Sequence, residues 1–269
     1  MDDADKLFAG SIPAVYQRYL VPLIFEPYAA ELAGRIAKAN PQKLLETAAG
    51  TGVATRAIAS VLPESARMVV TDLNQAMLQA ARHLGEDSRI EWRQADALAL
   101  PFEDCSFDLV ACQFGVMFFP DKQKGFRETY RVLREGGTFL FSVWNSIRSN
   151  EFADVVTEAL APLFPDDPPR FLARTPHGYH DTQQISSDLK AAGFTTVAFD
   201  EVEYISKCSS AKDCAVAYCQ GTPLRNEIEA RDAQGLNGAT RLAEEALTRR
   251  FGHDVIEGRI RAFVFTAAC

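Results

Sequence analysis

Apolar residues in the middle of the chain follow two alternating patterns. Short, mostly apolar runs typical of buried strands are separated by segments in which apolar residues recur every three or four positions, as along one face of a helix. The predicted strands are residues 43–46, 67–71, 90–94, 107–112 and 138–144, and the predicted helices between them are residues 53–62, 75–84 and 121–134. This alternation predicts parallel βαβ units with helices on both faces of one sheet.

The same patterns continue through the second half of the chain. Asp181 and Gln184 have the spacing of a capping box that opens a helix, and Gly193 closes it. Residues 165–176 are proline-rich and are expected to form an irregular loop. The other predicted elements are a helix over residues 151–163, a strand over 196–206, two or three helices within 209–252 and a last strand over 259–267. We therefore predict an α/β protein with a helical insertion, at about residues 207–255, before its last strand.

Residues 1–42 form an amphipathic, aromatic-rich helical pattern that is interrupted by prolines. Two interpretations of this segment are open. Its aromatic side chains could pack against the domain that begins at the first strand. Alternatively, the segment could form a flap over a pocket and lend Tyr16 or Tyr19 to a ligand.

Small residues fill the turn after the first predicted strand, where an open parallel sheet is expected to bind a ligand. Ala48, Gly50 and Gly52 keep side-chain bulk out of this turn. The backbone can therefore approach a ligand closely, and the following helix can point its N-terminus at it. Glu46 precedes these residues at the strand end. Its carboxylate could meet a ligand ammonium group or only brace the turn, and both interpretations remain open.

Polar side chains also follow the next three strands. Asp72 ends the second strand, and its carboxylate can accept hydrogen bonds from both hydroxyls of a ribose. Asp96 follows the third strand, where an adenine edge would lie, and could accept from an exocyclic amine while Ala97 offers a backbone amide. Gln113 and Phe114 follow the fourth strand. Together these strand ends predict a ligand that contains a nucleoside.

Composition narrows the class of partner. The 269 residues are 47% hydrophobic and carry a formal net charge of −8, which suits a globular protein with a sizeable core and argues against a general nucleic-acid binder. The most apolar early run, residues 19–25, is too short to span a bilayer, and the acidic start of the chain is not followed by a secretory apolar region. We therefore expect a cytoplasmic protein without membrane insertion.

Six cysteines are scattered along the chain without a CxxC pair. A disulfide framework is not expected in a chain of this size without an export signal. Cys208, Cys214 and Cys219 lie near one another in the sequence but lack the usual spacing of zinc ligands, so no metal site is expected. The cysteines are interpreted as buried free thiols.

Five segments at consistent spacing resemble the motifs of class I S-adenosylmethionine-dependent methyltransferases. They are residues 44–52 (LLETAAGTG), 70–78 (VTDLNQAML), 94–102 (QADALALPF), 107–114 (FDLVACQF) and 130–140 (YRVLREGGTFL). The most similar branch is the small-molecule group typified by ubiquinone and menaquinone biosynthesis methyltransferases, of methyltransferase type 11. The resemblance implies a Rossmann-like, doubly wound sheet of seven strands in the order 3-2-1-4-5-7-6, with the last strand antiparallel.

The resemblance also implies roles for the residues at the strand ends. The loop with Ala48, Gly50 and Gly52 would contact the methionine part of S-adenosylmethionine, and Asp72 would bind its ribose. Leu73 and Met77 would pack against the adenine, and Asp96 and Ala97 would hydrogen-bond to it. Gln113 and Phe114 would line the sulfonium and the substrate mouth.

In this scheme residues 1–269 form one methyltransferase domain. Residues 1–42 are its N-terminal flap, 43–145 its cofactor-binding core and 146–269 its substrate side. Glu46, Tyr16 and Tyr19 are additional candidates for contact with the cofactor.

Two departures from the family pattern are visible. Many members have glycine at the position of Ala48. Alanine with a positive φ would cost about 1 kcal/mol, so we expect an extended backbone there. After the fourth strand, the Asn/Asp-Pro-Pro-Tyr tetrad of many amino-group methyltransferases is absent. This absence argues against methylation of nucleic-acid bases or glutamine amides.

Methyl transfer from a sulfonium is an in-line displacement, in which the protein mainly aligns the nucleophile and excludes water. We expect a small-molecule acceptor with an oxygen or carbon nucleophile, phenolic or quinol-like. A phenol or enolate needs little help, whereas an aliphatic hydroxyl needs a base, for which His177 and His180 are candidates. The alternative is that both are loop histidines with satisfied hydrogen bonds.

Two other classes of function remain open at this point. A nicotinamide-dependent oxidoreductase would share the first loop and Asp72, but residues 50–55 lack the third glycine of that motif and Asp96 would have no role. A non-catalytic module that binds S-adenosylmethionine or another nucleoside would keep the same pocket. The oligomeric state does not follow from the sequence.

Overall fold

The computed structural model describes residues 10–85 and 87–269, which divide into two compact units. The sheet unit consists of Glu26–Val143, Tyr179–Val202 and Ala262–Cys269. The helical unit consists of the described residues up to Phe25, Trp144–Gly178 and Glu203–Arg261.

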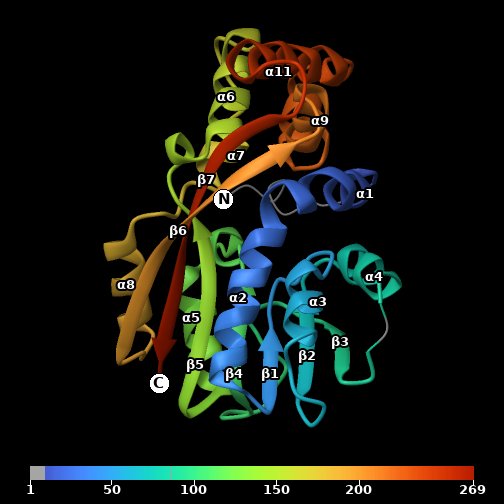
Figure 1. The fold of residues 1–269 in the computed structure, drawn as a ribbon. Coiled ribbons are helices and arrows are strands. Elements are labelled where there is room, and N and C mark those ends of the chain that lie inside the picture. Colours follow the sequence, from blue (N-terminus) through green and yellow to red (C-terminus); the bar gives the residue numbers. More distant parts are fainter. Residues whose placement is uncertain (1–9, 86) are drawn as a thin grey trace. The chain divides into compact units, whose positions relative to one another are not determined.

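One seven-stranded sheet has the order β3-β2-β1-β4-β5-β7-β6 (Figure 1). Its strands are β1 (Lys43–Glu46), β2 (Arg67–Asp72), β3 (Ile90–Gln94), β4 (Phe107–Gln113), β5 (Leu133–Trp144), β6 (Thr196–Cys208) and β7 (Ile256–Ala268). The pairs β1–β2, β1–β4, β2–β3 and β4–β5 are parallel. The helical crossovers α3 (Val53–Ala59), α4 (Gln75–His83) and α5 (Lys122–Val132) return the chain to the same edge of the sheet, which makes parallel pairing possible.

The last strand, β7, runs antiparallel to both of its neighbours. The amide of Cys269 donates to the carbonyl oxygen of Gly137, near the start of β5, at 3.2 Å. The amide of Thr195, next to the start of β6, donates to the carbonyl oxygen of Ala268 at 3.0 Å. The end of β7 thus meets the beginnings of β5 and β6. The predicted strand order and the antiparallel last strand are both confirmed.

Alternate side chains of β5 face opposite sides of the sheet. Leu140 belongs to a buried cluster formed with α2 (Glu26–Ala39) and α3. Phe139 and Phe141 instead contact Phe126 of α5, with ring centroids 6.0 and 5.7 Å apart. Helices therefore cover both faces of the sheet, as the sequence pattern predicted.

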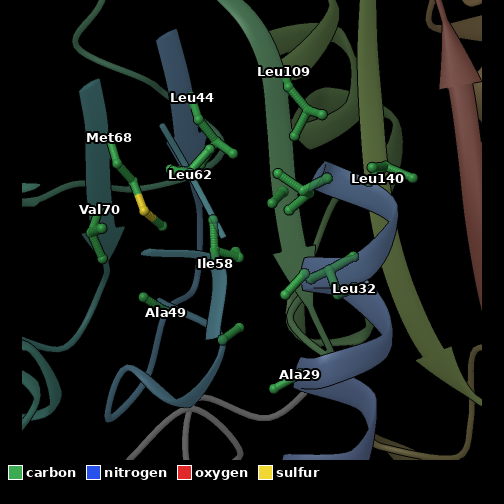
Figure 2. Close-up of a cluster of buried hydrophobic side chains, with 14 of the residues drawn as sticks. Ala29, Leu32, Leu44, Ala49, Ile58, Leu62, Met68, Val70, Leu109 and Leu140 are labelled. Carbon is green, nitrogen blue, oxygen red and sulfur yellow. The ribbon is translucent and has the colours of Figure 1, made fainter. Parts of the chain in front are cut away.

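The buried cluster on the α2 side fixes β1 and the turn that follows it (Figure 2). Leu44 of β1, Leu32 of α2 and Ile58 of α3 have no more than 1% of their surface exposed. Ala49, which lies in the turn after β1, belongs to the same cluster. The turn is therefore anchored in the core on one side, and this anchoring positions the residues around it.

The helical unit packs α11 (Leu236–Phe251) against α6 (Glu151–Leu160) and α9 (Ala211–Gln220). Helix α9 also contacts the π-helical segment η2 (Tyr16–Phe25). The remaining elements are α1 (Ile12–Val15), α7 (Phe171–Arg174), α8 (Thr182–Ala191, in the sheet unit), α10 (Leu224–Arg231) and the short turns η3 (Val116–Phe118), η4 (Ile147–Ser149) and η5 (Ala161–Leu163). The prediction of two or three helices within 209–252 is confirmed. Among the described residues, no helix is both long enough and apolar enough to cross a membrane.

Several predicted boundaries are wrong. Helix α3 ends at Ala59 instead of residue 62, because a proline at position 63 disfavours helical backbone before it. Strand β5 begins at Leu133, and an irregularity in its pairing with β4 accommodates Gly136 at φ +72°. The loop predicted over 165–176 contains the short helix α7. Residues 1–9 of the predicted flap lie outside the described residues.

The cysteines are free, but not all of them are buried. Cys112, Cys208, Cys214 and Cys219 are buried, as predicted, whereas Cys105 is exposed. Cys105 lies in the polar turn before β4 with φ +54°, and turns of this kind run over the surface. The interpretation of Cys105 as a buried thiol is therefore wrong.

Candidate cofactor site

The turn between β1 and α3 is held by backbone hydrogen bonds to both neighbouring strands. The amide of Thr47 donates to the carbonyl oxygen of Ala111 in β4 at 2.9 Å. The amide of Ala49 donates to the carbonyl oxygen of Thr71 in β2 at 3.0 Å. The amide of Gly52 donates to the carbonyl oxygen of Ala49 at 2.9 Å and leads into α3. These bonds fix the conformation of the turn.

Three residues of this turn have a positive φ: Ala48 at +53°, Gly50 at +57° and Gly52 at +75°. The expectation of an extended backbone at Ala48 is therefore wrong. The hydrogen bonds of Thr47 and Ala49 hold the residue between them in the left-handed region, where a β-carbon costs about 1–2 kcal/mol. At Gly50 a β-carbon would meet nothing within 4 Å, so the turn leaves open space on that side.

Asp72 closes the turn from the end of β2. Its Oδ2 accepts a hydrogen bond from the amide of Gly50 at 2.8 Å, and its Oδ1 accepts from the amide of Asn74 at 2.7 Å. Burial raises the pKa of Asp72, and the hydrogen bonds from Asn74 and Gly50 oppose this rise. Because each carboxylate oxygen has two lone pairs, each can accept a further bond from a diol. This geometry fits the ribose-binding role.

The neighbours of Asp72 differ in exposure. Leu73 has 47% of its surface exposed, which suits contact with the apolar face of an adenine ring, whereas Met77 is 3% exposed and already packed in α4. A β-carbon at Gly52 would lie 3.1 Å from Cβ of Ala81 and 3.4 Å from the ring of Trp92. Glycine at position 52 therefore lets the turn lie close to α4 and β3.

Glu46 is buried at the end of β1, with 1% of its surface exposed. Its Oε2 accepts a hydrogen bond from Oγ1 of Thr55 at 2.6 Å. Burial raises its pKa to about 8; Thr55 opposes this rise and the nearby charge of Asp72 adds to it. This hydrogen bond joins β1 to α3, as expected if Glu46 braces the turn.

Asp96 and Ala97 follow β3. The backbone bond from Ala95 N to Asp72 O, at 3.1 Å, brings this segment beside the end of β2. Asp96 is exposed, and its Oδ1 accepts from the amide of Leu98 at 2.9 Å, so the carboxylate also caps its own turn. Ala97 is half-buried. The first three strand ends thus converge as the sequence predicted.

The end of β4 carries Gln113 and Phe114, which are 9% and 5% exposed. Phe114 has φ +51°, although it is not a glycine, and its ring lies edge-on to Tyr28 of α2 with centroids 5.2 Å apart. The amide of Phe114 donates to the carbonyl oxygen of Ser142 in β5 at 3.1 Å. Positive φ values at Ala48 and Phe114 place strained backbone at two neighbouring strand ends, which is typical of functional sites.

Four further candidates belong to segments other than the strand ends β1–β4. Tyr16, Tyr19 and His177 belong to the helical unit, and His180 belongs to the sheet unit. The ring of Tyr16 packs against Phe25, with centroids 5.2 Å apart. The roles of all four residues stay predictions.

His177 is buried, and its Nδ1 lies 2.9 Å from the carbonyl oxygen of Asn145. A carbonyl oxygen only accepts, so Nδ1 carries a proton, and in the neutral form of the ring the lone pair is on Nε2. The ring also packs near Trp144, with centroids 6.0 Å apart. His180 is half-buried and comes directly before Asp181, whose carboxylate caps α8 as predicted.

Thr51, Thr55 and Arg56 complete the turn but were not predicted as site residues. Thr55 holds Glu46, and Nη1 of Arg56 donates to the carbonyl oxygen of Thr51 at 2.8 Å. Within the described part of the chain, Oγ1 of Thr51 is buried without a hydrogen-bond partner, so it has capacity for a ligand. The available signal was the position of two hydroxyls on either side of Gly52, at the N-terminus of a helix.

The sequence model of the ubiE/COQ5 methyltransferase family matches residues 28–208. The chain belongs to this family. It is 31% identical over 172 residues to the demethylmenaquinone methyltransferase of Clavibacter sepedonicus, covering 60% of this chain and 69% of that protein. It is 30% identical over 171 residues to the ubiquinone/menaquinone biosynthesis C-methyltransferase UbiE of Escherichia coli, covering 59% and 68%.

The same fold occurs in the YcgJ protein of Bacillus subtilis. The two structures align with a TM-score of 0.57 over 88% of this chain and 97% of that chain. Their sequences are 17% identical, so this likeness supports the fold alone.

As a member of the ubiE/COQ5 family, the chain is an enzyme that transfers a methyl group from S-adenosylmethionine to a small-molecule acceptor. An oxidoreductase or a non-catalytic module is not favoured. The residues at and beside the turn fit this cofactor. The carboxylate of Asp72 suits its diol, Thr51 has hydrogen-bonding capacity, and Gly50 borders open space. Among the described residues, no cluster of three or more metal-ligating side chains occurs.

Proposed function

We propose that the methyl acceptor is a phenol or a quinol-like aromatic ring, methylated at a ring carbon or at oxygen. The names of two relatives support this class. One is a demethylmenaquinone methyltransferase, and the other is a ubiquinone/menaquinone biosynthesis C-methyltransferase. The family match ends at residue 208, before α9, α10 and α11. The choice of acceptor within the class is therefore expected to depend on residues particular to this chain.

The chemistry of such an acceptor explains why the protein needs few reactive groups. The cofactor, when bound, supplies an electrophilic methyl group and its own leaving group. A ring carbon beside a phenolate oxygen is electron-rich. This carbon would form the new bond to the methyl carbon. The ring then loses its proton from that carbon and regains aromaticity. The protein aligns the ring and excludes water.

We propose that the ends of β1, β2, β3 and β4 hold the cofactor. The observation that carries this proposal is the pair of backbone bonds to Asp72, from Gly50 and Asn74, which fix a buried carboxylate beside the turn. In this arrangement the turn faces the methionine part, Asp72 the ribose, and Asp96 and Ala97 the adenine edge. The further cofactor contacts proposed are Glu46, Ala48, Gly52, Leu73, Met77, Gln113, Phe114, Tyr16 and Tyr19.

His177 is proposed as the group that takes the acceptor proton, with His180 as the second candidate. The bond between Nδ1 of His177 and Asn145 supports this role, because it leaves Nε2 as the basic nitrogen. Residues 1–269 are proposed to act as one functional domain in the cytoplasm. A net charge of −8 supports a partner other than nucleic acid.

Two measurements test the proposal. Isothermal titration should show binding of S-adenosylhomocysteine and none of NAD. Incubation with methyl-labelled cofactor and a panel of a naphthoquinol, a benzoquinol, a catechol and an aliphatic alcohol should label the aromatic acceptors. Mass spectrometry of the products would locate the methyl group on carbon or oxygen. Labelling of the aliphatic alcohol alone would contradict the proposed acceptor class.

A further inference from the structure

Residues 95–106, which the structure describes throughout, link β3 to β4 without a helix and are held by side chains of α5. The amide of Leu100 donates to Oε2 of Glu128 at 2.8 Å, and the carbonyl oxygen of Leu100 accepts from Nη2 of Arg131 at 2.9 Å. Nη1 of Arg131 also donates to the carbonyl oxygen of Phe102 at 2.8 Å. Two side chains of one helix therefore bind the backbone of this crossover.

Arg131 and Glu128 also hold each other in place. Nε and Nη2 of Arg131 donate to the two carboxylate oxygens of Glu128, at 2.9 and 2.8 Å. Two parallel bonds of this kind fix the plane of the guanidinium group. Arg131 keeps the pKa of Glu128 below its ordinary value, so the pair is charged at neutral pH. The ion pair of Arg131 with Asp104, whose side chain is 72% exposed, is expected to add little.

The turn that contains Asp96 lies between two anchors. On one side, the amide of Ala95 bonds to the last residue of β2 at 3.1 Å. On the other side, Leu100 is bonded to α5 and is 4% exposed. Between them, the amides of Ala99 and Leu98 donate to the carbonyl oxygen and to Oδ1 of Asp96, both at 2.9 Å. The placement of Asp96 therefore depends on how Leu100 is held.

We infer that Arg131 is a positioning residue for the adenine of the cofactor, because its hydrogen bonds to the crossover hold Asp96 and Ala97 in the geometry that binds the adenine edge. The inference rests on the proposed cofactor site, in which these two residues face the adenine. A loop that is ordered before binding loses less conformational entropy when the ligand binds. Arg131 thus increases the affinity for the cofactor without touching it. Loosening the crossover should mainly weaken recognition of the exocyclic amine, which Asp96 accepts from.

Arg89 provides a matched control within the same sheet unit. Its Nη1 and Nη2 donate to the carbonyl oxygens of Leu62 and Ala59, both at 2.7 Å, and its guanidinium pairs with Asp87 at 2.6 Å. The side chains of Arg89 and Arg131 are 22% and 30% exposed. Arg89 therefore makes the same kinds of bonds at a similar depth. Its bonds join the end of α3 to the segment before β3.

The test compares S-adenosylhomocysteine with S-inosylhomocysteine, in which an oxygen replaces the exocyclic amine, by isothermal titration. The wild type should prefer the adenosyl compound by about 10-fold or more, because Asp96 would face an oxygen acceptor in the other. Arg131→Met should lower this preference by at least about threefold, through loss of one well-placed hydrogen bond. Arg131→Lys should lie in between, since lysine lacks the planar fork of donors. Arg89→Met should reduce stability but keep the wild-type preference.

Asp96→Ala separates this inference from the proposed site. A lost preference in Asp96→Ala together with a wild-type preference in Arg131→Met would overturn the role of Arg131 and leave the site intact. A wild-type preference in Asp96→Ala would contradict the adenine role of Asp96, and the inference with it. Circular dichroism and urea unfolding check that each variant is folded. If Arg131→Met does not fold, Glu128→Gln takes its place, because it removes the charge that holds the guanidinium, and it should lower the preference in the same direction.

Discussion

Ala48 and Gly115 lie so close together that a β-carbon built on Gly115 would be 2.5 Å from Cβ of Ala48. The same β-carbon would be 2.6 Å from Sγ of Cys112. Ala48 lies in the turn after β1, and Gly115 follows the end of β4. This contact therefore joins the two turns that border the candidate cofactor site.

Replacing Gly115 by alanine should separate these turns. Overpacking of this kind costs about 1–3 kcal/mol, because the backbone of one turn must move. We expect a lower free energy of unfolding in urea and weaker binding of S-adenosylhomocysteine by isothermal titration. The control is Gly238→Ala in α11, where a β-carbon meets nothing within 4 Å and should raise stability by about 0.5–1 kcal/mol. Wild-type stability and affinity in Gly115→Ala would show that the turns move freely.

Replacing Ala48 by glycine should stabilise the protein. The backbone of Ala48 has φ +53°, so removing its β-carbon relieves about 1 kcal/mol of strain. Ala57→Gly, within α3, is the control with the opposite sign, because glycine weakens a helix by about 1 kcal/mol. Urea unfolding measures both. Equal destabilisation by the two changes would contradict the strain at position 48. In Ala48→Leu, binding of S-adenosylhomocysteine should be lost.

The sequence predicted the sheet but not the backbone of the turn, and the reason is physical. Strand and helix spacing is a local signal, so β1 and the ends of β2 and β3 were placed correctly from residues 43–96. The φ of Ala48 is set by hydrogen bonds from its neighbours to Ala111 and Thr71, which are distant in sequence. The contact between Ala48 and Gly115 likewise depends on β1 and β4 being adjacent.

The candidate site residues also divide into features that follow from the local sequence and features that depend on distant contacts. Asp72 could be predicted because a carboxylate at a strand end faces the ligand edge of the sheet. The bond from Thr55 to Glu46 could not, since it depends on how α3 packs over β1. For His177, the sequence shows only a residue type in a loop. Its hydrogen bond to Asn145 arises from the fold.

Asp72→Asn should weaken cofactor binding. The amide nitrogen would face one of the two backbone amides that now donate to the carboxylate, from Gly50 and Asn74, and one acceptor for the ribose would be lost. Hydrogen bonds to a charged group contribute about 1.5–3 kcal/mol, so affinity for S-adenosylhomocysteine should fall about 10- to 100-fold. Asp104→Asn is the control, because that carboxylate is exposed and pairs with Arg131. Unchanged affinity in Asp72→Asn would remove Asp72 from the site.

Glu46 should make stability depend on pH. Its pKa is about 8 in the folded protein, against an ordinary value of 4.5, so the folded state binds more protons than the unfolded state between these values. The free energy of unfolding contributed by Glu46 therefore falls as pH rises from about 4.5 to 8, by at most about 1.4 kcal/mol per pH unit.

The measurement is urea unfolding of wild type and Glu46→Gln at pH 5, 6, 7 and 8. Glutamine does not titrate. The free energy of unfolding of the variant should therefore rise relative to that of the wild type as pH increases. Thr55→Val removes the hydrogen bond that favours the carboxylate, so the pKa should rise further and the pH-dependent range should extend upward. A stability difference between wild type and Glu46→Gln that is constant over this range would show that Glu46 is ionised throughout.

His177→Gln should slow methyl transfer without weakening cofactor binding. If His177 takes the acceptor proton, its loss should lower kcat by about 10²–10⁴-fold, while KM for the acceptor changes little. His180→Gln is the matched control, since it changes the second histidine of the same segment. A normal kcat in His177→Gln would assign the ring to structure, through its bond to Asn145 and its packing on Trp144. A large fall in kcat for His180→Gln alone would transfer the proton-accepting role to His180.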